Sequence, residues 1–311
     1  MLVYFLYVLA AIGAYATLIF LYFTLRSPFQ ILWSVVFGCG KTLSQKYGPW
    51  AVITGSTDGI GKQYAINLAR QGMNVFLLSR SGSKLEAVAQ EIRSQSKVEV
   101  RWKAIDFADG FKVYDTIERK MTGLDVGVLV NNVGVLPRSP LYFERLRPEE
   151  IQQTLAVNIS SALMMTRIIL PAMKARRRGI VVNVSSASGL IPWPLIGLYS
   201  GSKGFLNNFT SALQQELRGT GVQCQLVTPM YVATNLIDHF PVTSFLRLFR
   251  ATVVRYGRQA TWLIGKTDVT TGYWYHAVQV TLLKLIPVEF LTRMSYYQNR
   301  RDFLKNSSNV E

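Results

Sequence analysis

Three side chains near the middle of the sequence carry groups that can exchange protons with a carbonyl. Tyr199 and Lys203 lie four residues apart at the start of a predicted helix, so both point from one helix face. A phenol has an ordinary pKa of about 10, and a nearby ammonium lowers that pKa by favouring the phenolate. Ser186, at the end of the preceding predicted strand, offers a hydroxyl to the same space. Together the three residues suit acid–base chemistry on a carbonyl, although a Tyr-x-x-x-Lys pair by itself is commonly structural.

A glycine-rich turn follows the first predicted strand of the folded region, residues 50–54. Glycine lets the backbone approach a pyrophosphate closely, and the helix N-terminus that follows supplies free N–H groups and a positive dipole. The spacing is G-x-x-x-G-x-G rather than the usual G-x-G-x-x-G. Because the turn follows the first strand of an alternating pattern, we predict a dinucleotide site rather than a plain turn. The predicted site residues are Gly55, Ser56, Asp58, Gly59, Ile60 and Gly61.

The end of the second predicted strand indicates which dinucleotide binds. In NAD sites an acidic residue about 20 residues further on holds the ribose hydroxyls, whereas an arginine accommodates a 2′-phosphate. Here the strand ends at Ser79-Arg80, and the next acidic residue, Glu86, already lies within the following predicted helix. The sequence therefore predicts NADPH/NADP⁺, with Arg80 facing the phosphate. The alternative is a solvated arginine at a strand end.

Apolar strands alternate with helices from residue 48 to about residue 285, and these elements must position the residues above. Strands are predicted at 50–54, 73–79, 98–105, 126–131, 180–185 and 222–228. The longest predicted helices cover about 148–174 and 199–217. This order predicts the α/β class, a Rossmann-type doubly wound parallel sheet covered on both faces. No linker divides the region, so residues 48–311 are expected to form one domain.

The first 25 residues contain no charged residue. At ~1.5 Å per residue, about 20 such residues cross the ~30 Å hydrocarbon layer of a bilayer. The segment lacks the basic start and the shorter apolar core of a cleaved signal peptide, so we predict a transmembrane anchor over 1–25. The alternative is a buried hydrophobic hairpin. The first charges after the segment are Arg26, Lys41 and Lys46, which predicts that the following domain lies in the cytosol.

Two other apolar stretches are too short to span a bilayer. Residues 31–40 lie within the expected juxtamembrane segment 26–47 and are predicted to lie at the membrane interface or to pack on the domain. Residues 280–290 are predicted to form a second membrane contact.

The composition excludes several classes of protein. With 49% apolar and 17% charged residues, the chain is not disordered. Two cysteines and two histidines exclude a disulfide framework and a structural zinc site, and we predict no metal. The net charge of +16 suits an anionic membrane, an anionic cofactor or nucleic acid. No base-stacking aromatic motif lies on a basic face, so nucleic acid is not predicted as a partner.

On these motifs, residues 50 to about 277 resemble a short-chain dehydrogenase/reductase. Within that family the sequence is similar to membrane-anchored 17β-hydroxysteroid dehydrogenases and very-long-chain 3-oxoacyl-CoA reductases. The matching segments are TGSTDGIGK (54–62), LLSR (77–80), VGVLVNNVG (126–134), VNVSSASG (182–189), YSGSK (199–203) and TPMYVAT (228–234). TTGYWYHAVQ (270–279) resembles the hydroxysteroid dehydrogenase-like branch, whose vertebrate member has Phe in place of the catalytic tyrosine. This sequence keeps Tyr199, which favours activity.

The resemblance implies a role for each matching residue. Tyr199 would donate the proton, Lys203 would hold the nicotinamide ribose and lower the pKa of Tyr199, and Ser186, rather than Ser185, would polarise the substrate. Asn158 would help to organise a proton-relay water. The other implied contacts are Asn131 with the central sheet, Asn132 with the cofactor, Asp106 with the adenine and Thr234 with the carboxamide. Pro229-Met230 replaces the usual proline-glycine after the sixth strand.

The substrate predictions rest on two segments. Residues 189–197 form an apolar, proline-braced loop whose Trp193 is predicted to contact a steroid or acyl chain, with ordinary loop packing as the alternative. Residues from about 235 to 266 are the expected substrate lid. Part of this segment lacks acidic residues and carries Arg247, Arg250, Arg255, Arg258 and Lys266. These cations suit the phosphates of an acyl-CoA or an anionic lipid surface, or they form a solvated helix face.

The sequence therefore predicts NADPH-dependent reduction of a lipid ketone, most simply a long-chain 3-oxoacyl-CoA, with a 17-ketosteroid next. The endoplasmic reticulum membrane is the expected location, with a mitochondrial membrane as the alternative. A homodimer through the two long helices is possible, although an anchor can replace that interface. The rival function is a catalytically weak, membrane-tethered scaffold.

Overall fold

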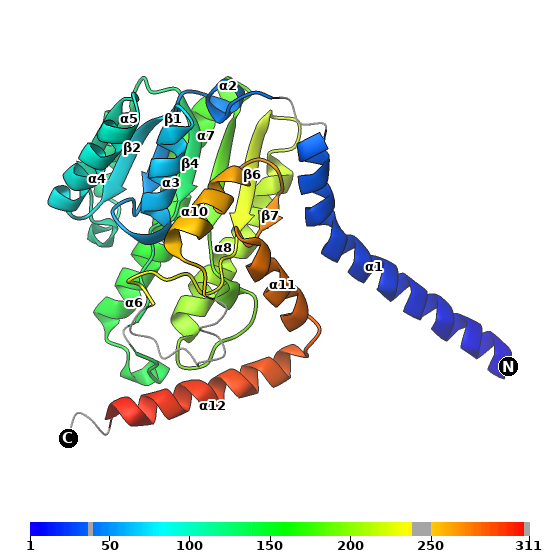
Figure 1. Ribbon diagram of the computed structural model, residues 1–311. Coiled ribbons are helices and arrows are strands. Elements are labelled where there is room, and N and C mark those ends of the chain that lie inside the picture. The colour runs from blue at the N-terminus through cyan, green and yellow to red at the C-terminus, as the bar shows by residue number, and fades with distance from the viewer. Residues whose placement is uncertain (37–39, 138, 238–249, 308–311) are drawn as a thin grey trace. The chain divides into compact units, whose positions relative to one another are not determined.

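The computed structural model describes residues 1–36, 40–137, 139–237 and 250–307 (Figure 1). The chain divides into two compact units, Met1–Gly40 and Lys41–Glu311.

The first unit is the single helix α1 (Leu2–Val36). Its segment Leu2–Arg26 is apolar and long enough to cross a membrane. The helix continues to Val36, so the first part of the apolar stretch 31–40 belongs to the same helix. Residues 37–39 lie outside the described part.

The second unit contains a parallel sheet of seven strands in the order β3-β2-β1-β4-β5-β6-β7. The strands are β1 (Trp50–Thr54), β2 (Asn74–Ser79), β3 (Val100–Ala104), β4 (Val126–Asn131), β5 (Gly179–Val184), β6 (Val222–Val227) and β7 (Val269–Thr270). The chain crosses from β3 back to the far side of β1 to form β4, so the strand order reverses between β1 and β4. In such sheets ligands bind at the carboxyl ends of the strands at this reversal. The doubly wound sheet predicted from the sequence is confirmed.

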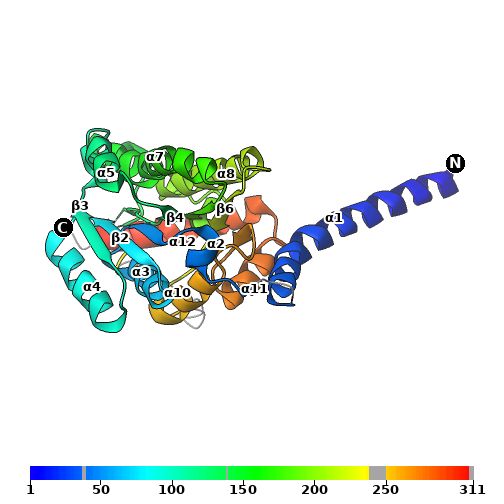
Figure 2. The same ribbon diagram turned by 90° about the horizontal axis from the view of Figure 1, so that it is seen from above.

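Helices cover both faces of the sheet (Figure 2). The helices of this unit are α2 (Leu43–Tyr47), α3 (Gly59–Arg70), α4 (Gly82–Gln95), α5 (Val113–Met121), α6 (Pro148–Thr154), α7 (Ser161–Ala175), α8 (Gly197–Glu216), α10 (Val253–Trp262), α11 (Trp274–Leu283) and α12 (Val288–Ser307). One face carries α3, α4 and α10, and the other carries α5, α7 and α8. Side chains of β1 alternate between the two buried clusters: Ala51 and Ile53 pack on the first face, and Trp50 and Val52 on the second.

Two predicted segments fold differently from the expectation. The long helix predicted over about 148–174 is helical throughout, but Leu155–Ser160 between α6 and α7 is π-helical. Part of the lid expected at 235–266 is the helix α10, which packs against α3 through buried Tyr256 and Ala260. Gly257 allows this close approach, because a Cβ there would lie 2.2 Å from the Gln63 Cβ. Residues 238–249, including Arg247, lie outside the described part of the chain.

The stretch 280–290 forms the end of α11, a turn and the start of α12. Leu282, Leu285 and Phe290 are 58–60% exposed, so the stretch presents apolar side chains to solvent. Val280 is buried, and the segment packs partly on the domain.

Candidate active site

A pocket of about 500 Å³ lies at the carboxyl ends of the strands, where the strand order reverses. Its lining comes mainly from the turns after β1, β2, β3, β4, β5 and β6 and from the start of α8. The predicted site residues in this lining are Gly55, Asp58, Gly59, Ile60, Arg80, Asp106, Asn132, Ser186, Tyr199, Lys203 and Thr234. The structure therefore brings residues of six of the seven matching segments to a single cavity, and only the segment 270–279 contributes none.

In the glycine turn after β1, the positions of Gly55 and Gly61 have no room for a side chain. Gly55 has φ +66°, and a Cβ added to it would lie 2.9 Å from the Val133 Cα. A Cβ on Gly61 would lie 2.2 Å from the Gly55 carbonyl oxygen. The Asn132 amide holds the same turn, donating to the carbonyls of Thr54 (3.1 Å) and Gly55 (3.2 Å). Both the glycines and Asn132 thus shape a backbone cradle of the kind that a pyrophosphate requires.

The amino end of α3 opens into the pocket beside the turn after β6. Asp58 caps the helix by accepting from the Gly59 N–H at 2.7 Å. The Asn235 amide donates to the other Asp58 carboxylate oxygen at 2.6 Å, and Thr234 lies against Gly59. These contacts join the turn after β6 to the glycine turn. Ser56 is fully buried and does not line the pocket.

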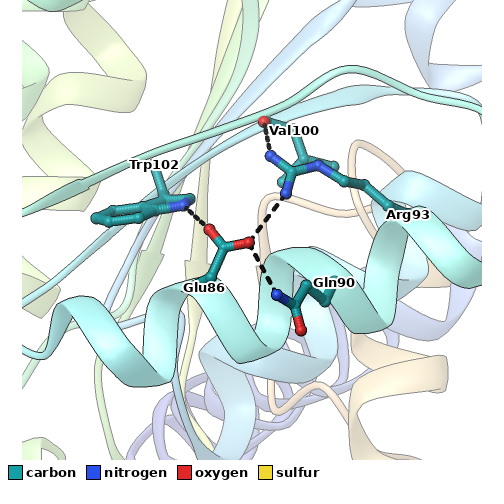
Figure 3. A network of polar contacts seen from close by, with 5 residues as sticks. All are labelled: Glu86, Gln90, Arg93, Val100 and Trp102. Carbon is teal, nitrogen blue, oxygen red and sulfur yellow. Dashed lines mark hydrogen bonds and ion pairs between the residues drawn. The ribbon is translucent and has the colours of Figure 1, made fainter.

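At the end of β2, Ser79 and Arg80 line the pocket, and the Arg80 side chain is exposed. Glu86 faces away from it: one carboxylate oxygen accepts from the Trp102 indole at 2.7 Å, and the other accepts from Gln90 and Arg93 (Figure 3). The Trp102 hydrogen bond lowers the pKa of Glu86. Both carboxylate oxygens of Glu86 are used in this network, and Glu86 does not line the pocket. It is therefore not placed to bind the ribose of a dinucleotide beside Arg80.

The catalytic end of the pocket lies where β5 meets α8. The Tyr199 hydroxyl is hydrogen-bonded with the Ser186 and Ser188 side chains. The Lys203 ammonium lies 5.8 Å from the centroid of the Tyr199 ring and donates to the Val184 carbonyl at 3.2 Å. Ser185 instead donates to the Lys203 carbonyl and fixes β5 to α8. The geometry thus puts Ser186, and not Ser185, beside the phenol.

Burial dominates the electrostatics of this pair. It raises the pKa of Tyr199, which the hydrogen bonds with Ser186 and Ser188 lower in part. Burial also lowers the pKa of Lys203 to about 8. The net shift of the Tyr199 pKa is upward because burial outweighs these hydrogen bonds. The Lys203 ammonium lies over the Tyr199 ring and donates to the backbone, and its predicted lowering of the Tyr199 pKa stays a prediction.

Asn158 lies in the π-helical segment and is 2% exposed. Its amide accepts from the Val135 N–H at 2.8 Å and donates to the Val135 carbonyl and to Ser202. It therefore ties the turn after β4 to α8, next to Lys203. Asn131 is buried between β4 and β5 and donates to Asn183 at 2.8 Å, which agrees with its predicted role in the sheet.

Trp193 does not line this pocket, although the sequence predicted it as a substrate contact. The loop that carries it folds back on other parts of the domain: the Leu141 N–H donates to the Leu195 carbonyl, and Asn299 of α12 donates to the Pro194 carbonyl. A one-dimensional pattern of apolar residues does not show which way such a loop turns.

Two residues near the site were missed by the sequence analysis. Ser188 contacts both Ser186 and Tyr199, and its only signal is its position two residues after Ser186. His276 is fully buried behind the turn after β6 and accepts from the Met230 N–H at 3.4 Å. Burial lowers its pKa to about 4, so the imidazole is neutral. No cluster of metal-ligating side chains occurs among the described residues.

The family assignment agrees with this geometry. The short chain dehydrogenase family matches residues 49–241, and the chain belongs to that family.

Three relatives show where the chain lies within the family. A very-long-chain 3-oxoacyl-CoA reductase-A of Danio rerio is 41% identical over 85% of this chain and 82% of its own length. A hydroxysteroid dehydrogenase-like protein 1 of Gallus gallus is 41% identical over 78% and 73%. An inactive hydroxysteroid dehydrogenase-like protein 1 of Homo sapiens is 38% identical over 80% and 76%. The chain is thus an oxidoreductase of a group that includes lipid reductases and a protein named as inactive.

Solved structures agree with the fold. A 7β-hydroxysteroid dehydrogenase superimposes with a TM-score of 0.75 and 26% identity over 82% of this chain and 99% of its own. A metagenomic short-chain oxidoreductase in complex with NADP is 32% identical over 59% and 83%, with a TM-score of 0.56.

Proposed function

We propose that the protein reduces the ketone of a lipid to a secondary alcohol with NADPH, and that a long-chain 3-oxoacyl-CoA is its first substrate. The observation that carries this proposal is the convergence of Tyr199, Ser186 and Lys203 on one wall of a pocket whose other walls are a glycine cradle and Arg80.

The residues of the pocket fit a dinucleotide phosphate. The glycine turn and the start of α3 would hold the pyrophosphate, Asp106 the adenine, Arg80 the 2′-phosphate and Thr234 the carboxamide. When bound, the reduced nicotinamide supplies a hydride to the carbonyl carbon and becomes NADP⁺. The match with an NADP-bound structure at 32% identity supports this choice of cofactor.

The protein's own part in the reaction is proton transfer and positioning. As the carbonyl carbon accepts the hydride, the Tyr199 O–H bond breaks and its proton passes to the carbonyl oxygen, which becomes the alcohol. Ser186 donates a hydrogen bond to that oxygen as its negative charge grows. Lys203 holds the ribose of the nicotinamide and keeps a positive charge beside the phenol. Asn158 fixes the turn after β4 and would organise a relay water.

The substrate class follows from the relatives and from charge. Arg255 and Arg258 on α10 are exposed, and exposed cations suit the phosphates of a coenzyme A. The 41% identity to a named very-long-chain 3-oxoacyl-CoA reductase favours an acyl-CoA over a 17-ketosteroid. The lid that the sequence predicts at about 235–266 is part of this proposal.

Membrane attachment is part of the proposal. The apolar helix α1 would anchor the protein in the endoplasmic reticulum membrane with the catalytic unit in the cytosol, and the exposed apolar turn at 280–290 would touch the same bilayer. Alkaline carbonate extraction tests this, because release into the soluble fraction would contradict a spanning helix.

The reductase is tested by NADPH oxidation in detergent, with a long-chain 3-oxoacyl-CoA and a 17-ketosteroid side by side and Tyr199→Phe as the blank. We expect turnover that falls about 10²- to 10⁴-fold in the variant, because the proton donor is lost. A faster reaction with the 17-ketosteroid would show that a steroid, and not an acyl-CoA, is the preferred substrate. Turnover that survives in the variant would remove Tyr199 from its role.

A second candidate is a catalytically weak, membrane-tethered scaffold, which the 38% identity to a relative named as inactive favours. It predicts NADPH binding without turnover of either substrate.

A further inference from the structure

A second serine stands behind the Ser186–Tyr199 pair. The Ser188 hydroxyl donates to the Ser186 Oγ at 2.9 Å, and the Ser188 backbone N–H donates to the same oxygen at 3.1 Å. The Ser188 side chain is also hydrogen-bonded with the Tyr199 hydroxyl. It does not line the pocket, so it reaches the reacting groups only through Ser186 and Tyr199.

These contacts limit the direction in which the Ser186 hydroxyl can donate its proton. A serine hydroxyl has one proton to donate and two lone pairs that accept. Ser188 occupies both lone pairs of Ser186, one with its N–H and one with its O–H. The Ser186 proton therefore has to point away from Ser188, toward Tyr199 or toward a carbonyl oxygen in the pocket.

The short element that carries Ser188 is held rigidly. Ser186–Ser188 lies at the start of a 3₁₀ turn, Ala187–Gly189, whose Gly189 carbonyl accepts from Asn207 of α8 at 2.9 Å. A Cβ on Gly189 would lie 2.6 Å from the Lys203 carbonyl carbon, so the turn sits directly on the helix that carries Tyr199. The Ala187 N–H donates to the Pro229 carbonyl at 2.8 Å, which fixes the turn from the other side.

We infer that Ser188 is a positioning residue that fixes the direction of the Ser186 hydroxyl, so that Ser186 donates to the substrate carbonyl oxygen while Tyr199 delivers its proton. The inference rests on the ketone reduction proposed above, and it adds a residue that the four implied catalytic residues do not include.

Steady-state kinetics of the full-length protein in detergent provide the first test. In Ser188→Ala, Ser186 regains a free lone pair and its proton can turn away, so we expect kcat for ketone reduction to fall about tenfold, the loss of one hydrogen bond. The KM for the ketone and the affinity for NADPH should stay within about twofold, because Ser188 touches neither. Ser188→Thr keeps a hydroxyl and should restore most of kcat.

Ser200→Ala is the matched control. Its hydroxyl lies one residue from Tyr199 but donates to the Gly197 carbonyl within α8, so kcat should be unchanged. A loss in Ser188→Ala that appears equally in Ser200→Ala, or that appears as a higher KM without a lower kcat, would contradict the inference.

A second readout needs no substrate. With 3-fluorotyrosine incorporated at position 199, ¹⁹F NMR follows the ionisation of that phenol directly. In Ser188→Ala the Ser186 proton can turn away from the phenol, whose pKa the Ser186 hydrogen bond lowers, so the titration should move to higher pH, while Ser200→Ala leaves it in place. An unmoved titration would overturn the inference. If neither substrate is reduced by the wild type but the titration still shifts, the proposed function fails while the contact of Ser188 with the phenol stands.

Discussion

At the catalytic end of the pocket, Tyr199 and Lys203 are 8% and 4% exposed, whereas at the far end the Arg80 side chain lies in solvent. The catalytic groups lie after β5 and on α8, where Tyr199 is hydrogen-bonded with Ser186 and Ser188 and Lys203 donates to the Val184 carbonyl. Arg80 projects from a strand end, and the structure gives it no comparable support. Under the proposed function, the groups that transfer the proton are built into regular secondary structure, whereas the proposed choice between NADPH and NADH depends on one exposed cation at the rim of the pocket.

A substitution at the buried, catalytic end of the pocket should have the largest effect on activity. In Lys203→Met, the ammonium below Tyr199 is lost, and we expect kcat/KM to fall about 10²- to 10³-fold. The Tm should not fall in proportion, because a buried ammonium carries a desolvation cost that an apolar side chain of similar length does not. Kinetics and thermal unfolding measured on one preparation check both halves, and near-normal kinetics would show that Lys203 is a packing residue.

A substitution in the glycine turn should have the next largest effect, on cofactor affinity and on stability. In Gly61→Ala, the new Cβ meets the Gly55 carbonyl oxygen at 2.2 Å, so we expect NADPH affinity to fall at least about tenfold and stability to fall by about 1–3 kcal/mol. Gly201→Ala, with nothing within 4 Å, is the control and should be as stable as the wild type or slightly more stable. Isothermal titration and chemical unfolding report the two quantities. Equal behaviour of the two variants would contradict a tight cradle.

The exposed rim should affect cofactor choice more than rate. In Arg80→Ala, a charge-assisted bond to the 2′-phosphate is lost, so the preference for NADPH over NADH should fall about 10- to 100-fold, with little change in kcat. Arg70→Ala, at the far end of α3 and bonded to Gln95, is the control and should keep the preference. An unaltered ratio of kcat/KM values in Arg80→Ala would remove Arg80 from the cofactor site.

The smallest effect on activity is expected from His276, behind the turn after β6, where the expected effect is on stability and depends on pH. The pKa of His276 is lowered by burial to about 4, against 6.5 in an unfolded chain. The unfolded state therefore binds a proton first as the pH falls, and stability is lost between about pH 6.5 and 4, by up to about 3 kcal/mol. His276→Asn can still accept from the Met230 N–H and should lack this dependence. The free energies of unfolding of both proteins are measured at pH 7 and pH 4.5. An equal loss of stability in the two proteins on lowering the pH would contradict the role of His276.

The sequence was enough to predict that residues at strand ends would meet. Gly55, Arg80 and Ser186 follow buried strands, and the structure brings them to one pocket with Tyr199 of α8, because the carboxyl ends of parallel strands meet at one edge of the sheet. Such residues are brought together by the fold class itself.

The remaining features depend on contacts between loops and helices distant in sequence, which local patterns do not encode. Trp193 does not line the pocket, because hydrogen bonds from Leu141 and Asn299 hold its loop against other parts of the domain. Part of the expected lid is the core helix α10, since Gly257 lets it approach α3. The orientation of Lys203 toward the Val184 carbonyl likewise appears only in three dimensions.

The most direct test of hydride and proton transfer follows the label from cofactor to product. The wild type and Tyr199→Phe are each incubated with NADPH carrying two deuterium atoms at the nicotinamide C4 and with a long-chain 3-oxoacyl-CoA, and the product is analysed by mass spectrometry. We predict a 3-hydroxyacyl-CoA with one deuterium on the new carbinol carbon from the wild type, and almost none from the variant. Product without deuterium, or equal labelled product from both proteins, would contradict the proposed chemistry.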